Sequence, residues 1–473
     1  MSNPSPVRLA LRLRALPSIP GLMLVSGLTL GSAACSGGAD DDGMNLLFVS
    51  LDTVRADHVG CYGYGRPTTP VIDALAADGH RFDSAYTVMA TTLPAHLSMF
   101  TSLFPAQHNV LANGFKVPDD AHTMAERLGA EGFRTGGFVS AIPLDKGVNI
   151  GQGFDVYDSP GREPRKGGDT CAEAMRWIDS GSGNGRPFFC FVHMYDPHSW
   201  YQTDDPEFTT PFNAPLGKPL PPERGFLDSP IDPRTRLTSI DAYDAGIRYA
   251  DAQVGVLLEF LEKRDLRDNT IVIVVSDHGE TLDELYETES YAFDHGEFLS
   301  RRELRIPLVI WLPGSYSERG PAVHDSLVSV LDLLPTVLDL LGQPRTPPMF
   351  GRSLAGLMAD EPLPERLHFS QRRSLERSDL KHLDGQELSV TDGRWHLVRS
   401  QARESQLFDT QIDPAEETNV LKKFPNRAGK LEKSRMNWVQ VMQNPFWEAD
   451  GELTAEDEAA LRALGYMGGE KPE

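Results

Sequence analysis

The sequence predicts an α/β protein in which a mixed, mostly parallel sheet is sandwiched by helices, with a smaller α+β subdomain at the C-terminal end. First, apolar runs of strand length, such as MNLLFVSLD and NTIVIVVSDHGE, alternate with stretches of helical periodicity. This alternation is typical of a parallel sheet covered by helices on both faces. Second, the runs beyond Gly342 become short and alternating, as in ELSVTDGRWHLVRS and ESQLFDT, which indicates a small antiparallel sheet. We therefore expect a main domain at 44–345 and a C-terminal subdomain with a terminal helix at 346–473.

The composition allows a large core and disfavours two classes of partner. The 473 residues are 40% hydrophobic and 24% charged, which is ordinary for a globular protein. The net charge of −23 would repel nucleic acid and an anionic membrane surface. Apart from Cys35, the cysteines are Cys61, Cys171 and Cys190, an odd number without metal-ligand spacing, so no disulfide framework is indicated.

The first 35 residues have the pattern of a targeting segment, with three arginines before residue 15 and then an apolar run that is short for a membrane span. Small residues precede Cys35 and resemble a bacterial lipoprotein signal, in which the cysteine is acylated, although Ser32 stands where a leucine-like residue is usual. Cleavage after Ala34 without acylation is the alternative. Residues 36–43 are polar and glycine-rich, which predicts a flexible linker. We expect an exported lipoprotein held at the bacterial envelope, in the periplasm or at the cell surface, by its lipid anchor alone.

Three of the predicted strands run into polar residues that can carry chemistry. MNLLFVSLD ends at Asp52, NTIVIVVSDHGE passes into Asp277 and His278, and RPFFCFVHMYDPH leads to His198. The carboxyl ends of parallel strands meet at one edge of a sheet, which is where ligands bind in open α/β folds. Two carboxylates and an imidazole that converge there would form a site for a divalent metal ion.

The remaining elements follow from periodicity and from helix-ending residues. TPVIDALAADG and AHTMAERLGAEG read as helices closed by Gly79 and Gly132. RIPLVIWLPG reads as the last core strand, and SLVSVLDLLPTVLDLLG as a helix that Pro335 breaks or kinks. The proline-rich segment 201–236 has little periodicity, so we expect a functional or mobile loop there.

Several motifs agree in order and spacing with one known family. SLDTVRADHVGCYGYG, TTLPAHLSMFTSLFPAQHNVLANG, DPHSWY, VSDHGE and DHGEFL, with the later QLFDTQIDPAEETNV and LRALGYM, resemble the sulfatase family of the alkaline phosphatase superfamily. The resemblance covers nearly the whole mature chain and implies an alkaline-phosphatase-like fold, with 44–345 as a sulfatase-type catalytic domain. It also implies that Asp52, Asp277 and His278 are metal ligands.

The ligand set departs from the family pattern in ways that bear on the metal. Thr53 stands where the family usually has a second acid, and His278 replaces a common amide. Calcium is the default of the family, but fewer carboxylates and more imidazole favour zinc or manganese.

The nucleophile position departs most clearly. Sulfatases present Cys-x-Pro-x-Arg, whose cysteine is oxidised to formylglycine, whereas this chain has the string TLPAH, which begins at Thr92. Threonine cannot become formylglycine, so we expect none. The string resembles the threonine nucleophile of nucleotide pyrophosphatase/phosphodiesterases and phosphoethanolamine transferases. Pro94 should open a helix with Thr92 at its amino end, where free N–H groups favour an anion, and Thr92 would be a fourth metal ligand. The alternative is that Thr92 only caps that helix.

Other candidate site residues are assigned from the resemblance. Asn113 would donate a hydrogen bond to a non-bridging oxygen in the transition state, unless it is only the turn residue of an Asn-Gly pair. His198 and His295 would protonate the leaving group or contact its oxygens. His96, at the place of the family arginine, and His108 would contact substrate, whereas His193 reads as core-facing.

These residues predict a metal-dependent hydrolase of sulfuric or phosphoric esters, acting on a sulfated or phosphorylated small molecule or glycan. A phosphodiesterase or phosphonate hydrolase, a phosphoethanolamine-type transferase and a non-catalytic glycan-binding relative are the alternatives. A sulfo-threonine cannot collapse as the formylglycine hemiacetal does, and this favours phosphate esters.

Overall fold

The structure of the protein is a computed structural model that describes residues 43–198, 206–209, 212, 239–289, 291–314, 320–373 and 385–442. The predicted signal, Cys35 and all but the last residue of the predicted linker lie outside the described residues. The predicted loop at 201–236 does too, except for 206–209 and 212, and so does the terminal string LRALGYM.

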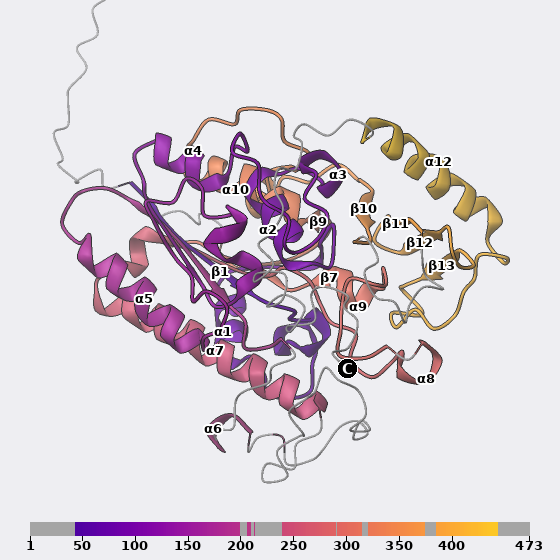
Figure 1. Cartoon of the computed structure of the whole chain (residues 1–473), viewed down its shortest axis with the longest axis horizontal. Coiled ribbons are helices and arrows are strands. Elements are labelled where there is room, and N and C mark those ends of the chain that lie inside the picture. Colours follow the sequence, from indigo (N-terminus) through magenta and orange to yellow (C-terminus); the bar gives the residue numbers. More distant parts are fainter. Residues whose placement is uncertain are drawn as a thin grey trace, which may run out of the picture. The chain divides into compact units, whose positions relative to one another are not determined.

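Figure 1 shows the order of the elements. The strands of the large sheet are β1 (Asn45–Leu51), β2 (His80–Tyr86), β3 (Arg134–Val139), β4 (Val156–Asp158), β5 (Phe188–Met194), β6 (Thr270–Ser276), β7 (Arg305–Ile306), β8 (Leu308–Trp311) and β9 (Ala322–Ser329). The helices are α1 (Pro70–Ala77), α2 (Thr92–Thr101), α3 (Pro105–His108), α4 (Met124–Ala130), α5 (Gly167–Ser180), α6 (Pro206–Thr209), α7 (Ser239–Lys263), α8 (Tyr286–Glu289), α9 (Arg301–Leu304), α10 (Leu333–Leu340), α11 (Ala355–Met358) and α12 (Pro425–Val441). The strands of the small sheet are β10 (His368–Gln371), β11 (Glu387–Thr391), β12 (Trp395–Ser400) and β13 (Gln406–Asp409).

Within the described chain, the large sheet has nine strands in the order β4-β3-β5-β1-β6-β8-β2-β7, and β9 pairs with β2. The block β4-β3-β5-β1-β6 is parallel throughout, whereas β8 runs antiparallel to both β6 and β2. The sheet is therefore mixed and mostly parallel, as predicted. The described small sheet is antiparallel, in the order β10-β11-β12-β13, and the predicted C-terminal sheet is confirmed.

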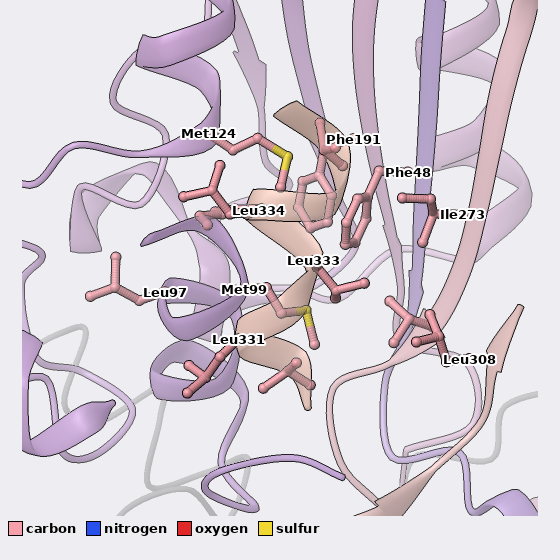
Figure 2. Close-up of a cluster of buried hydrophobic side chains, with 14 of the residues drawn as sticks. Phe48, Leu97, Met99, Met124, Phe191, Ile273, Leu308, Leu331, Leu333 and Leu334 are labelled. Atoms are coloured by element: carbon pink, nitrogen blue, oxygen red, sulfur yellow. The ribbon is translucent and has the colours of Figure 1, made fainter. Parts of the chain in front are cut away.

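Side chains alternate between the two helix layers along each central strand, because successive residues of a strand point to opposite faces. On β1, Leu46 and Phe48 pack into the cluster of α2, α4 and α10, whereas Leu47 and Val49 pack into the cluster of α1, α5 and α7. In Figure 2 the side chain of Phe48 lies beside that of Phe191. These strands are buried on both faces, which explains their nearly continuous apolar sequence.

Two predicted elements differ from the structure. The segment predicted as a helix from Ser326 begins as the end of strand β9, and helix α10 starts only at Leu333. The reason is local: Ser329 and Asp332 form a capping box that ends the strand and opens a 3-10 turn at Val330–Asp332, and α10 continues from this turn. Pro335 lies in the first turn of α10, so it neither breaks nor kinks the helix. RIPLVIWLPG is also not the last core strand, since β9 follows it.

The two predicted helix-ending glycines have different roles. Gly132 follows α4 with φ +91°, the left-handed conformation expected of a glycine that closes a helix. Gly79 has no such φ; a Cβ there would lie 2.9 Å from the carbonyl oxygens of Leu75 and Ile310. Gly79, which lies between α1 and β2 in the chain, therefore allows its own backbone to pack closely against the backbones of α1 and β8. None of the helices in the described ranges is long and apolar enough to cross a membrane.

Candidate active site

Strands β1, β5 and β6 end at the same edge of the sheet. Leu51 pairs with Met194 on β5 and with Ser276 on β6, so Asp52 and Asp277 leave adjacent strands side by side. Single ligand atoms of Asp52, Asp277 and His278 lie within 4.8 Å of one another, and all three residues are fully buried. The expected convergence of two acids and an imidazole at one sheet edge is present.

Each of the two carboxylates has one oxygen bound within the protein and one oxygen without a hydrogen bond to any described residue. Asp52 Oδ2 lies 3.1 Å from His193 Nε2, and Asp52 Oδ1 has no partner. Asp277 Oδ1 accepts from the N–H groups of Thr53 at 3.2 Å and His278 at 2.9 Å, and Asp277 Oδ2 accepts no hydrogen bond. Buried polar atoms normally have partners, so a pair of orphaned carboxylate oxygens fits a metal-binding role.

The raised pKa values of Asp52 and Asp277 also fit a metal-binding role. Burial raises the pKa of Asp52 to about 7, and the charge of His278 opposes this rise only in part. Burial and the neighbouring charge of Asp52 raise the pKa of Asp277. Two buried carboxylates that repel each other are stabilised by a cation between them, and perturbed acids of this kind are common at functional sites.

The side chains of His278 and Thr92 complete the group. His278 Nδ1 donates to the carbonyl of Gly279 at 2.9 Å, which leaves the lone pair of Nε2 for a ligand. That Nε2 atom lies 3.5 Å from Thr92 Oγ1 and 3.4 Å from Asp277 Oδ2. The donors therefore offered at this point are two carboxylate oxygens, an imidazole nitrogen and a hydroxyl, which fits a divalent cation.

Thr92 is the first residue of α2, and the N-cap is Thr91. The interpretation of Thr92 as a helix cap is therefore wrong. Pro94 lies in the first turn, so it removes one N–H donor, and the N–H of Leu93 donates to Asn113 Oδ1 at 2.8 Å. This hydrogen bond fixes the Asn113 amide and leaves its buried Nδ2 without a partner among the described residues, in keeping with the predicted donor role.

His198 and His295 lie beside the same group. The His295 ring is 4.3 Å from the ring of His278 and 5.2 Å from that of His198, measured between centroids. Burial is the main cause that holds the pKa of both residues well below the usual range, and a positive charge on His278 would add to this effect. His295 Nδ1 lies 3.3 Å from Glu280 Oε2, so this carboxyl orients the ring.

The two histidines that were expected to contact substrate, His96 and His108, are both held by hydrogen bonds within the protein. His96 lies next to the acids, 3.7 Å from Asp277 Oδ2, but its Nδ1 donates to the carbonyl of Thr92 and its Nε2 bonds the Ser50 hydroxyl. Both nitrogens of His108 are also occupied, by the Ser98 hydroxyl and the N–H of Val110. Neither ring has a nitrogen left for a substrate, because intramolecular partners within the core occupy both.

An ion pair connects the small sheet to the loop that carries His295. Arg373 follows β10, and its Nη2 lies 2.7 Å from Glu297 Oε1, with both side chains buried. Gly296, between His295 and Glu297, has φ +91°, and a Cβ there would lie 2.9 Å from the Arg373 Nε. The guanidinium therefore packs directly on the backbone beside His295.

Comparison with known proteins shows which family the chain belongs to. The family model for sulfatases matches residues 44–343, which is more than half of the chain. The chain belongs to the sulfatase family. A curated relative, the ulvan-active sulfatase of Formosa agariphila, is 24% identical over 416 residues, covering 80% of this chain and 77% of the relative.

Two solved structures have the same fold. One, an enzyme in complex with its substrate D-glucosamine-2-N,6-O-disulfate, matches with a TM-score of 0.69 at 18% identity, covering 85% of this chain and 98% of the other. The phosphonate monoester hydrolase of Agrobacterium radiobacter matches with a TM-score of 0.67 at 18% identity, covering 84% and 96%. The predicted family, fold class and enzyme class, a sulfatase-like ester hydrolase, are confirmed.

Sequence reasoning missed three residues of this candidate site. His193 was read as core-facing, yet it bonds Asp52; Glu280 and Ser50 were not singled out, yet they orient His295 and His96. Glu280 could have been found, since it follows His278 by two residues in the VSDHGE string. His193 and Ser50 stand inside apolar strands, and only the pairing of the strands brings them to the site.

Proposed function

We propose that this protein is a metal-dependent hydrolase of sulfuric or phosphoric esters in which Thr92 is the nucleophile. The observation that carries the proposal is the position of the Thr92 hydroxyl, 3.5 Å from His278 Nε2 at the start of α2, beside two orphaned carboxylate oxygens. A hydroxyl at a helix start, next to a cation site, is placed for attack on an anionic ester.

Asp52, Asp277, His278 and Thr92 would hold one divalent cation. Such an ion, when bound, would neutralise the carboxylates and lower the pKa of the Thr92 hydroxyl. Only two of these donors are carboxylates and one is an imidazole, which favours zinc or manganese over the calcium that is usual in the family.

The proposed reaction uses the side chains around this point. The Thr92 oxygen bonds to the sulfur or phosphorus atom while the bond to the leaving oxygen breaks, and the hydroxyl proton passes to solvent. His198 or His295 protonates the leaving oxygen; the negative charge of the bound ester opposes the effect of burial and raises their pKa. Asn113 Nδ2 donates to a non-bridging oxygen. Water then cleaves the threonine ester, releasing the inorganic anion and restoring the hydroxyl.

Two observations bear on the substrate. The relative named as an ulvan-active sulfatase, and the solved structure that holds a glucosamine disulfate as its substrate, support a sulfated glycan. A threonine ester must be cleaved by water, because threonine cannot release the anion by the collapse of a hemiacetal as formylglycine does. This argument supports a phosphoric ester, diester or phosphonate as the substrate. The phosphonate monoester hydrolase with the same fold supports it too. We favour the phosphorus esters because a sulfo-threonine would be slow to turn over.

A substrate panel tests the proposal. Protein loaded with zinc, manganese or calcium is assayed on an aryl sulfate, an aryl phosphate monoester and an aryl phosphate diester. Thr92→Ala should lower kcat by about a thousandfold or more while metal binding persists. The adjacent Thr91→Val is the control, because among the described residues the Thr91 hydroxyl bonds the carbonyl of Ala90 alone and should be dispensable.

Thr92→Cys, coexpressed with a formylglycine-generating enzyme, tests the sulfate alternative. We expect this variant to gain sulfatase activity, whereas the wild type cleaves only the phosphorus esters. This pair of results would support a phosphohydrolase that has the sulfatase fold. Rapid turnover of aryl sulfates by the wild type would contradict the argument from sulfo-threonine, and full activity of Thr92→Ala would contradict the nucleophile.

A further inference from the structure

We propose that His193 is a positioning residue that decides which oxygen of Asp52 faces the metal. The inference deepens the proposed function, since it takes Asp52 as a metal ligand. His193 interrupts an apolar strand, FFCFVHM, and its side chain is fully buried. Burial of an imidazole has a free-energy cost unless hydrogen bonds offset it, so a histidine at this core position calls for a partner.

That partner is Asp52. Residue 193 pairs with Ser50 in the parallel ladder between β1 and β5, and the N–H of Asp52 donates to the carbonyl of Met194 at 2.9 Å. The backbones of the two residues are thus fixed relative to each other. His193 Nε2 lies 3.1 Å from Asp52 Oδ2 and donates to it, while Oδ1 keeps no partner among the described residues. The hydrogen bond therefore selects Oδ1 as the free oxygen.

The orientation of the His193 ring is fixed in turn by His96. The two rings pack edge to face with centroids 5.1 Å apart. His96 is held at both nitrogens, through Nδ1 to the carbonyl of Thr92 at 2.7 Å and through Nε2 to the Ser50 hydroxyl at 2.8 Å. The His193 ring, which orients Asp52, therefore packs against the His96 ring, which is hydrogen-bonded to the backbone of Thr92. The position of the Asp52 carboxylate is thus coupled to that of the proposed nucleophile.

A donor on the distal oxygen of a ligating carboxylate keeps that carboxylate in one rotamer and in single-oxygen coordination. Loss of such a partner typically weakens metal binding by about 10- to 100-fold. A residue that served only to fill space in the core would change stability and leave the affinity of the metal unchanged.

Three variants separate these roles. His193→Leu fills the space without a donor, and His193→Gln places an amide N–H near the position of Nε2. Cys190→Ala is the control for damage to β5, because Cys190 is buried on the same strand and packs into the other helix layer. Metal-free protein is titrated with Mn²⁺ by calorimetry, and Tm is recorded without metal.

We expect His193→Leu to weaken Mn²⁺ binding by about 10- to 100-fold, and His193→Gln to recover most of that loss. Cys190→Ala should lower Tm and leave the affinity unchanged. Equal affinity in wild type and His193→Leu would overturn the positioning role, as would equal losses in the Leu and Gln variants. If the wild type itself binds no divalent ion, the proposed metal site fails, and this outcome is distinct from a failure of His193.

Discussion

The amide of Asn113 is held in one orientation, because its Oδ1 accepts from the N–H of Leu93. Asn113→Asp keeps this acceptor but removes the buried Nδ2 donor and adds a charge that repels an anionic ester. We expect kcat/KM to fall by about 100- to 1000-fold with little change in Tm. Asn149→Asp is a contrasting control, because the Asn149 Nδ2 donates to Val117, Asp119 and Gln152, so it should lose stability and keep kcat/KM. Normal activity of Asn113→Asp would remove the donor role.

Single residues were predictable where a strand delivers them to the sheet edge. Asp52, Asp277 and His278 follow long apolar runs, and the run length together with the parallel sheet predicted their meeting. The role of His193 was not predictable, because it depends on the register between β1 and β5, which no periodicity reveals. The engagement of both His96 nitrogens was also hidden, because the Ser50 hydroxyl lies on β1, 46 residues earlier in the chain, and only the packing of α2 against the sheet brings it to the ring.

At the level of elements, one capping box opens the 3-10 turn Val330–Asp332, which leads into α10. Ser329 Oγ accepts from the N–H of Leu331, and Asp332 accepts from the N–H of Ser329. Ser329→Ala should therefore lower the free energy of unfolding by about 1 kcal/mol, measured by urea denaturation. Ser434→Ala is the control, because Ser434 is a half-buried serine in the middle of α12 and its loss removes no cap. Equal stability of Ser329→Ala and wild type would show that packing alone sets this boundary.

The contact between β2 and β9 should make the fold sensitive to acid. His80 Nδ1 lies 3.0 Å from His324 Nε2, and burial, followed by the charge of His324, lowers the pKa of His80 to about 4. The unfolded chain, with a histidine pKa of about 6.5, takes up protons first, so stability falls as the pH drops from about 6.5 to about 4. Tm measured at pH 7.5 and 5.0 should fall less in His80→Gln than in wild type. Parallel losses would assign the acid sensitivity to other groups.

Strands β2 and β9 are also the elements that sequence reasoning missed or misread. HRFDSAY mixes charged and apolar residues, because β2 lies near the end of the sheet order and is only partly buried. The SLVS segment of β9 is continuous with an apolar helix, and periodicity over so few residues does not separate the two states. Element type was therefore predictable for long, fully buried runs and less so for strands at the margin of the sheet.

For the whole molecule, we propose that the protein is exported and acylated at Cys35, which lies outside the described residues. The basic start, the apolar run and the small residues before Cys35 support this. Metabolic labelling with a palmitate analogue should mark the wild type and leave Cys35→Ala unlabelled. Equal labelling of the two proteins would contradict acylation at this cysteine.

The contact between Arg373 and Glu297 limits how this protein can be recombined with its relatives. A chimera that takes its small sheet from another sulfatase would leave Glu297 buried without a counter-charge, unless the donor sheet supplies a guanidinium at the place of Arg373. Removing one partner of a buried ion pair costs about 3 to 5 kcal/mol, and the loss would fall beside His295. A C-terminal segment can therefore be exchanged to alter substrate range only if it carries a positive charge that pairs with Glu297. Glu297→Gln, made together with the exchange, would remove this requirement.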